Sequence, residues 1–365
     1  MLSIFIPQET LEDIVINNMA SDTKPEDQDV WFKIFTKQKV IYVSSKEEDE
    51  KDFSQGYQED NTLQILSNSH GVQVKDASQY IKDIPQNHQL VTQNRNGIFL
   101  LDISEEDAAQ IQKDYGVICQ SVKNMNASVL IDQGLRYSPE ENDENYSWYY
   151  MLGRISGEHI PSNHLIMIDR YLFADSSKLE STLDNIFYIL DAMLPHYELK
   201  CPYKVTIFYG EQKDGNGVGI SQAASKVYSI IPDLKRPYKI NVEVIYFLHF
   251  CDLNKPFHNR RILTNYTITQ LEHQLNALED EKSTCHQTVT PQRLFSLSGL
   301  AGYCDSPHKM HHDLMSYIND YFIWWTQNYL SPKSTYSFNG QVKLINKLYE
   351  VDETEEIITL YEKNC

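Results

Sequence analysis

One stretch of the chain, residues 96–122, restricts the choice of fold more than any other. It begins with the apolar run Ile98–Ile103, which is typical of a buried strand. Ser104 and the acidic residues that follow it are typical of a helix N-terminus, and Gly116 is typical of a helix end. The chain then returns to an apolar run, Val117–Val122. A strand, a helix and a second strand in this order predict parallel strands and therefore an α/β fold.

The chain of 365 residues is long enough for two domains. Polarity rises sharply over residues 137–146, YSPEENDENY, which we interpret as a boundary. We therefore predict an N-terminal α/β domain over residues 1–140 and a second α/β domain over residues 150–365. Both are expected to contain mostly parallel sheets. At the end of the second domain, helices are predicted over residues 309–329 and 341–349.

The most distinctive chemistry lies in residues 257–266, FHNRRILTNY, which follow the apolar, strand-like run of residues 240–250. His258 and Arg260 are two positions apart, so on an extended segment their side chains point to the same side. An imidazole and a guanidinium in that arrangement can face one anionic group. Arg261 is expected on the opposite face, where a structural role is the simpler interpretation.

The pattern His258-x-Arg260-x4-Asn265 resembles the H-x-K-x4-D motif of the phospholipase D-like superfamily, with arginine and asparagine replacing lysine and aspartate. The order of strands and helices over residues 155–330 is similar as well. The resemblance implies a phospholipase D-like second domain in which His258 is the nucleophile, Arg260 binds phosphate and Asn265 supports a histidine. Such sites combine two motifs, and this chain offers one, so an active enzyme would be a homodimer.

Asp169 is a further candidate for the catalytic site, because it follows the strand-like residues 164–168. Ligands bind beyond the carboxyl ends of the strands in open α/β sheets. We expect Asp169 to pair with His258 or Arg260 across that edge. The alternative is that Asp169 only starts the turn into the next helix.

Two functions fit these residues. The first is a phosphodiesterase, specifically a nuclease-type effector of a bacterial defence or mobile-element system, with His258, Arg260, Asn265 and Asp169 at its site. The second is a non-catalytic phospholipase D-like module that recruits a protein partner or a phosphate-bearing ligand. The replaced lysine and aspartate favour binding, whereas the retained histidine and cation favour catalysis.

The formal net charge of −19 argues against a protein that coats nucleic acid, because neutralising phosphates requires basic residues. A local basic pocket around Lys255, His258, Arg260 and Arg261 could still contact nucleic acid. The acidity also suits a subunit of a larger complex with a basic partner. Six scattered cysteines, no signal peptide and no membrane-length apolar run lead us to expect a cytoplasmic protein without membrane contact.

No cofactor and no metal are expected. The glycine-containing residues 210–219 lack the spacing of a nucleotide-binding loop. His308, His311 and His312 could share one helical face, but they lack an H-E-x-x-H pattern and suit a polar helix start equally well.

The ends of the predicted N-terminal strands carry Glu9, Asp102 and Asp132. These carboxylates could converge, as they do in metal-dependent nucleases of the PIN type. No local spacing requires this convergence, so a structural role for them is the preferred interpretation.

Overall fold

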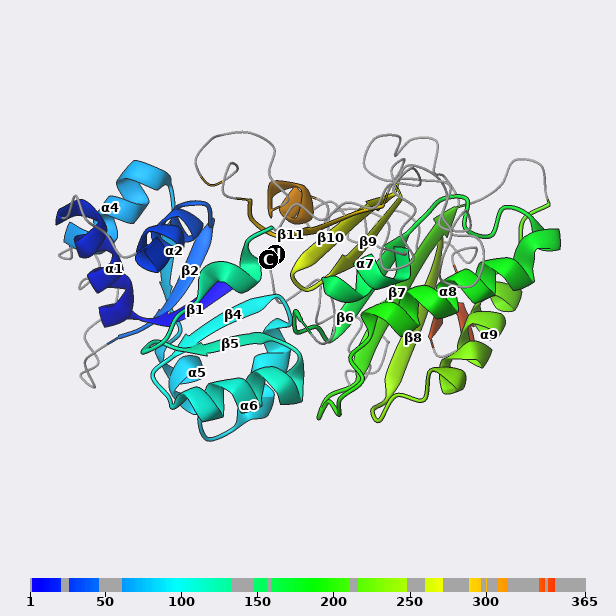
Figure 1. Ribbon diagram of the computed structural model, residues 1–365, viewed down its shortest axis with the longest axis horizontal. Helices are drawn as coiled ribbons and strands as arrows, with labels where there is room; N and C mark the ends of the chain where they lie inside the picture. Colours follow the sequence, from blue (N-terminus) through cyan, green and yellow to red (C-terminus); the bar gives the residue numbers. More distant parts are fainter. Residues whose placement is uncertain are drawn as a thin grey trace. The chain divides into compact units, whose positions relative to one another are not determined.

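The computed structural model describes residues 2–20, 26–45, 61–132, 148–155, 159–210, 216–247, 260–271, 289–296, 300, 308–313, 335–338 and 341–344. The chain divides into two compact units, both of the predicted α/β class (Figure 1). The first unit contains residues 1–131 and 295–306, and the second contains residues 132–294 and 307–365.

The division between the units differs from the predicted one, because the chain leaves the first unit after Ile131 and later returns to it. The backbone N–H of Phe295 donates to the carbonyl of Leu130 at 3.0 Å, and Ile131 pairs with Phe295 in a short parallel bridge. Phe295 is buried. A rise in polarity can predict a boundary within the sequence, but it cannot predict a segment that returns from residues far along the chain.

The first unit is built on a parallel sheet with the strand order β3-β2-β1-β4-β5. Figure 1 shows α1, α2 and α4 on one face of this sheet and α5 and α6 on the other. The elements are β1 (Ser3–Pro7), α1 (Gln8–Ala20), α2 (Glu26–Thr36), β2 (Val40–Ser44), α4 (Asn61–His70), β3 (Gln73–Asp76), α5 (Ser78–Asp83), β4 (Gly97–Leu101), α6 (Glu105–Tyr115) and β5 (Ile118–Ser121). Between and after them lie the 3-10 helices η1 (His88–Asn94) and η2 (Ala127–Leu130).

The β4-α6-β5 segment has the predicted helix ends. The hydroxyl of Ser104 accepts a hydrogen bond from the backbone N–H of Asp107 at 3.0 Å, which satisfies one exposed donor of the first turn. Gly116 closes α6 in the left-handed conformation, with φ of 61°, and its N–H donates to the carbonyl of Gln112. These two residues set where α6 begins and ends between β4 and β5.

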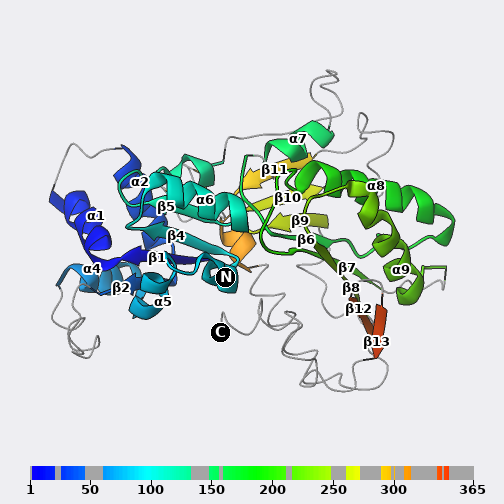
Figure 2. The same cartoon turned by 90° about the horizontal axis from the view of Figure 1, so that it is seen from below.

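The second unit is built on a mixed sheet with the order β11-β10-β9-β6-β7-β8-β12-β13. Figures 1 and 2 show α7, α8 and α9 on the same face of it. The elements are α7 (Trp148–Arg154), β6 (His164–Ile168), α8 (Leu179–Met193), β7 (Tyr203–Gly210), α9 (Ile220–Ile230), β8 (Ile240–Phe247), β9 (Arg260–Thr264), β10 (Thr267–Leu271), β11 (Val289–Arg293), β12 (Thr335–Phe338) and β13 (Gln341–Leu344). The 3-10 helices are η3 (Ser176–Lys178) and η4 (Ile231–Leu234).

The mixed sheet departs from the mostly parallel sheet expected for this unit. Among the neighbouring strands described in this sheet, only the pairs β6–β7 and β7–β8 are parallel, as predicted from the helices between them. A two-residue connection joins β9 to β10, and a connection this short forces antiparallel pairing. The helix predicted over residues 341–349 is wrong over Gln341–Leu344, which form β13 and pair with β12. The helix predicted at 309–329 is observed over 309–313, and its other residues lie outside the described part.

Among the helices that the structure describes, none combines the length and the apolar character needed to cross a bilayer.

Candidate functional site

Two of the predicted site residues, Asp169 and Arg260, lie together at one end of the second sheet. Asp169 directly follows β6, and Arg260 is the first residue of β9. The two strands are antiparallel with Ile168 opposite Arg261, which brings the end of one beside the start of the other. Nε of Arg260 is 3.8 Å from Oδ1 of Asp169. The Asp169 side chain is fully buried, whereas that of Arg260 is 16% exposed, so solvent reaches only the arginine.

Tyr171 and Arg170 complete this cluster, which we call the arginine–tyrosine site (Asp169, Arg170, Tyr171 and Arg260). The backbone N–H of Tyr171 donates to Oδ1 of Asp169 at 2.8 Å and fixes the turn. The guanidinium carbons of Arg170 and Arg260 lie 5.4 and 5.3 Å from the centre of the Tyr171 ring, within cation–π range. Two cations therefore share one aromatic ring, and one of them, Arg260, also lies beside the Asp169 carboxylate. The position of Arg170 and Tyr171, just after a strand end, is the sequence signal that could have assigned them.

Asn265 is not part of this cluster. It follows the last residue of β9, whereas Arg260 is the first. Its Oδ1 accepts hydrogen bonds from the backbone N–H groups of Asn163 and His164 at 3.0 and 3.1 Å, and its Nδ2 donates to Oδ1 of Asn163 at 2.9 Å. The side chain is buried. These contacts join the β9–β10 turn to the start of β6, so the structure separates Asn265 from the other predicted site residues and gives it a structural role.

We expect Asn265→Ala to lower the free energy of unfolding by about 2 kcal/mol, because two buried N–H donors would lose their acceptor. Urea denaturation followed by circular dichroism would measure the loss. The exposed Asn87 supplies the control, since Asn87→Ala should leave stability within about 0.5 kcal/mol of wild type. An Asn265→Ala variant that is as stable as wild type would contradict the structural role.

Arg261 points to the face of the sheet opposite Arg260, as predicted, because neighbouring residues of a strand alternate. It is partly buried, and desolvation lowers the pKa of its guanidinium. His258, the predicted nucleophile, lies outside the described residues, so its position relative to Asp169 and Arg260 stays a prediction.

A buried ion pair on the Arg261 face of the sheet was not predicted. Nζ of Lys204, in β7, lies 3.1 Å from Oε1 of Glu243, in β8, and their side chains are 5% and 1% exposed. The hydroxyl of Thr206 donates to Oε2 of Glu243 at 3.2 Å. The residues stand on neighbouring parallel strands, where Thr206 is directly opposite Glu243. The sequence signal is weak: charged residues interrupt two otherwise apolar strands.

Of the three histidines considered as metal ligands, His311 is the most deeply buried. Its Nε2–H donates to the carbonyl of Thr264 at 3.0 Å, and desolvation lowers its pKa to about 4. The rings of His308 and His312 stack with centroids 6.3 Å apart. Within the described part of the chain, no three His, Cys, Asp or Glu side chains are arranged to hold a metal ion. His311 is therefore a neutral packing residue.

Comparison of the chain with protein-family models and with curated proteins gave no match. The phospholipase D-like resemblance therefore stays a prediction from the pattern His258-x-Arg260-x4-Asn265 and from the order of strands and helices.

Proposed function

We propose that the second unit is a binding module for a phosphate-bearing ligand, which it holds at the arginine–tyrosine site. The observation that carries this proposal is that the guanidinium groups of Arg170 and Arg260 both lie within cation–π range of the Tyr171 ring, beside the buried Asp169. The two guanidinium groups bring several N–H donors to one place in a chain whose net charge is −19. An anion with several acceptor oxygens is the complementary ligand.

Partial burial strengthens this interpretation. Arg260 is mostly shielded from solvent, so its attraction for an anion is screened less than that of a surface arginine. Its Nε side faces Asp169, and the contact with Tyr171 restricts the guanidinium further. A guanidinium restricted in this way loses little conformational entropy when a ligand binds. The cluster also lies at the carboxyl end of β6, where open α/β sheets bind ligands.

Binding without turnover is favoured over cleavage by the position of Asn265, one of the residues to which the resemblance gives a catalytic role. Asn265 is used for structural hydrogen bonds at the other end of β9.

The test is a titration of the purified chain with a short, fluorescently labelled single-stranded oligonucleotide and with inorganic phosphate. Arg260→Met should weaken binding of the phosphate-bearing probe at least tenfold, because a charge-assisted contact is lost. Arg154→Met is the matched control: Arg154 is an exposed arginine of α7 whose guanidinium carbon lies 5.7 Å from the centre of a different tyrosine ring, that of Tyr150. It should bind like wild type. Equal binding by the Arg260→Met and wild-type chains would reject the proposal.

The competing phosphodiesterase predicts different results in the same experiment. It requires cleavage of the oligonucleotide in EDTA, loss of cleavage in His258→Ala and a homodimer that shares the site between two copies. Light scattering at micromolar concentration measures the assembly. A dimer with His258-dependent cleavage would replace the binding module by the enzyme, whereas a monomer that binds without cleavage supports the module.

We also propose a cytoplasmic location. Cys119 and Cys201 are both buried, and neither takes part in a disulfide. Desolvation raises the pKa of the Cys119 thiol to about 12, which keeps it protonated and unreactive. Buried thiols of this kind suit a reducing compartment.

A further inference from the structure

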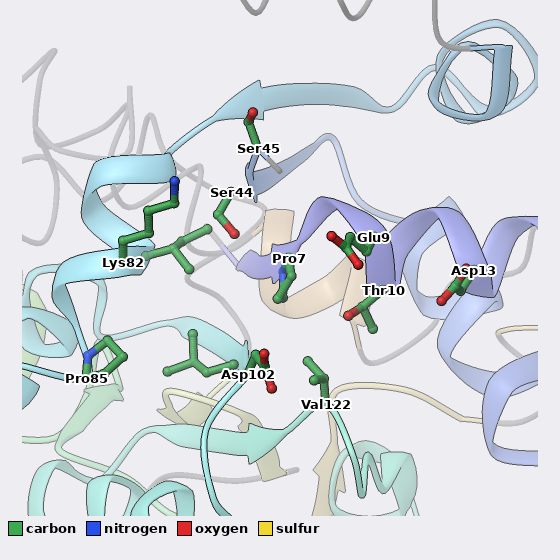
Figure 3. Close-up of a pocket in the computed structure, with 12 residues that line it drawn as sticks. Pro7, Glu9, Thr10, Asp13, Ser44, Ser45, Lys82, Pro85, Asp102 and Val122 are labelled. Atoms are coloured by element: carbon green, nitrogen blue, oxygen red, sulfur yellow. The ribbon is translucent and has the colours of Figure 1, made fainter. Parts of the chain in front are cut away.

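The first unit contains a pocket of about 570 Å³ at the carboxyl ends of its parallel strands (Figure 3). The chain runs from β1 to β2 and β3 in one direction and then continues with β4 and β5 on the other side of β1. The order of strands therefore reverses between β1 and β4. Pro7 at the end of β1 and Leu101 at the end of β4 both line the pocket. Crevices at such reversals are the usual ligand sites of open α/β sheets.

The polar lining of the pocket is mainly acidic. Glu9 and Asp13 come from the same side of α1, one turn apart, and Asp102 follows β4. Among the described residues that line the pocket, Lys82 is the one basic side chain, and Figure 3 shows it on α5, across the pocket from α1. Asp102 also has Lys123 as a neighbour, at 3.6 Å, but both side chains are about 70% exposed, so this pair contributes little. The lining carries a negative charge.

The remaining lining is apolar or carries hydroxyl groups. Ile81 and Leu101 are buried beneath the pocket and Val122 is partly buried, so the site offers a hydrocarbon wall as well as charge. Ser44 and Thr10 add hydroxyl donors and acceptors. A volume of this size accommodates a small organic molecule.

We infer that this pocket binds a small organic cation, an amine or guanidinium attached to a short hydrocarbon body. The cationic group would lie among Glu9, Asp13 and Asp102, and the hydrocarbon body would contact Ile81, Leu101 and Val122. Each part of the lining then has a complementary part of the ligand.

Two other ligand classes fit less well. A bare metal ion requires converging ligands, and within the described residues no three His, Cys, Asp or Glu side chains are so arranged. A phosphate-bearing ligand would meet three carboxylates and one lysine, and the chain between β1 and α1 has no glycine-rich loop to expose its amides. The pocket thus differs in ligand charge from the arginine–tyrosine site of the second unit.

The test is isothermal titration of the full chain with agmatine and with spermidine. Butylurea, a neutral analogue of the guanidinium end of agmatine, tests the need for charge. We expect at least one of the two cations to bind more tightly than butylurea, and Asp102→Asn to weaken its binding roughly tenfold. Glu9→Gln should weaken binding by a similar factor. Both residues are exposed, so their substitution should not prevent folding.

Glu106→Gln provides the control, because Glu106 is also exposed, in α6, but is not among the residues that line the pocket. It should bind the cation like wild type. The inference is overturned if neither cation binds below about 10 mM, or if Asp102→Asn binds as tightly as Glu106→Gln. It is also overturned if Mg²⁺ or ADP, rather than an organic cation, binds in a manner that depends on Asp102.

Discussion

Lys204→Met is expected to lower the free energy of unfolding by about 3–5 kcal/mol, the largest single effect that we predict for this chain. The substitution removes the ammonium 3.1 Å from Glu243 and leaves a carboxylate that is 1% exposed without its ion-pair partner. The hydrogen bond from Thr206 cannot offset the cost of a buried charge. Urea denaturation followed by circular dichroism would measure the change.

Two further variants separate the buried charge from general damage to the core. Lys204→Met combined with Glu243→Gln removes both charges and keeps an acceptor for Thr206, so it should recover most of the lost stability. Lys226→Met removes a cation 3.0 Å from Glu180, where the side chains are 44% and 78% exposed, and should cost less than about 1 kcal/mol. A double variant as unstable as Lys204→Met alone would mean that packing, not charge, explains the loss.

Acidification is expected to destabilise the second unit through His311. Its pKa is lowered to about 4 in the folded chain, mainly by desolvation, and should be near its ordinary value of 6.5 in the unfolded chain. The unfolded state therefore binds a proton first as the pH falls. The contribution of the neutral imidazole to the free energy of unfolding is complete above pH 6.5 and is lost progressively as the pH falls to about 4. The total loss is about 3 kcal/mol, with roughly 2 kcal/mol of it reached at pH 5.

Denaturation at pH 7.5 and pH 5 tests this expectation. His311→Gln should show a smaller difference between the two pH values than wild type does, by roughly 2 kcal/mol. His159 is exposed in the same unit, so His159→Gln should retain the wild-type difference. If His311→Gln loses as much stability on acidification as wild type, another group must be responsible for it.

Local signals predicted much of the fold. The apolar run before Ser104, the cap that this residue forms and Gly116 placed α6 between its strands, because these features act over a few neighbouring residues. Helix α2 is missing from the predicted elements, although Trp31, Ile34 and Phe35 are buried at helical spacing. The predicted strand pairing was less accurate, because antiparallel pairing of β9 with β6 depends on contacts about a hundred residues apart.

In the candidate site, too, features set by neighbouring residues were predicted, whereas features set by contacts between distant residues were not. Alternation along a strand predicted that Arg260 and Arg261 point to opposite faces, and the end of β6 predicted a neighbour for Arg260 at Asp169. The motif could not indicate that Arg260–Thr264 form one strand. Because Arg260 begins this strand and Asn265 follows its end, Asn265 lies away from Asp169. The pairing of Lys204 with Glu243 depends on the register between two strands, which no local pattern of residues specifies.

The return of residues 295–306 to the first unit has a consequence for how the protein is made. The first unit combines residues 1–131 with residues 295–306, and the buried Phe295 pairs with Ile131, so the unit lacks this side chain until synthesis has passed residue 295. Most residues of the second unit are therefore synthesised between the two segments of the first. In chains with consecutive domains the N-terminal domain can finish folding first, whereas here it cannot. For the same reason, truncation after residue 131 should yield an incomplete unit rather than an independent one.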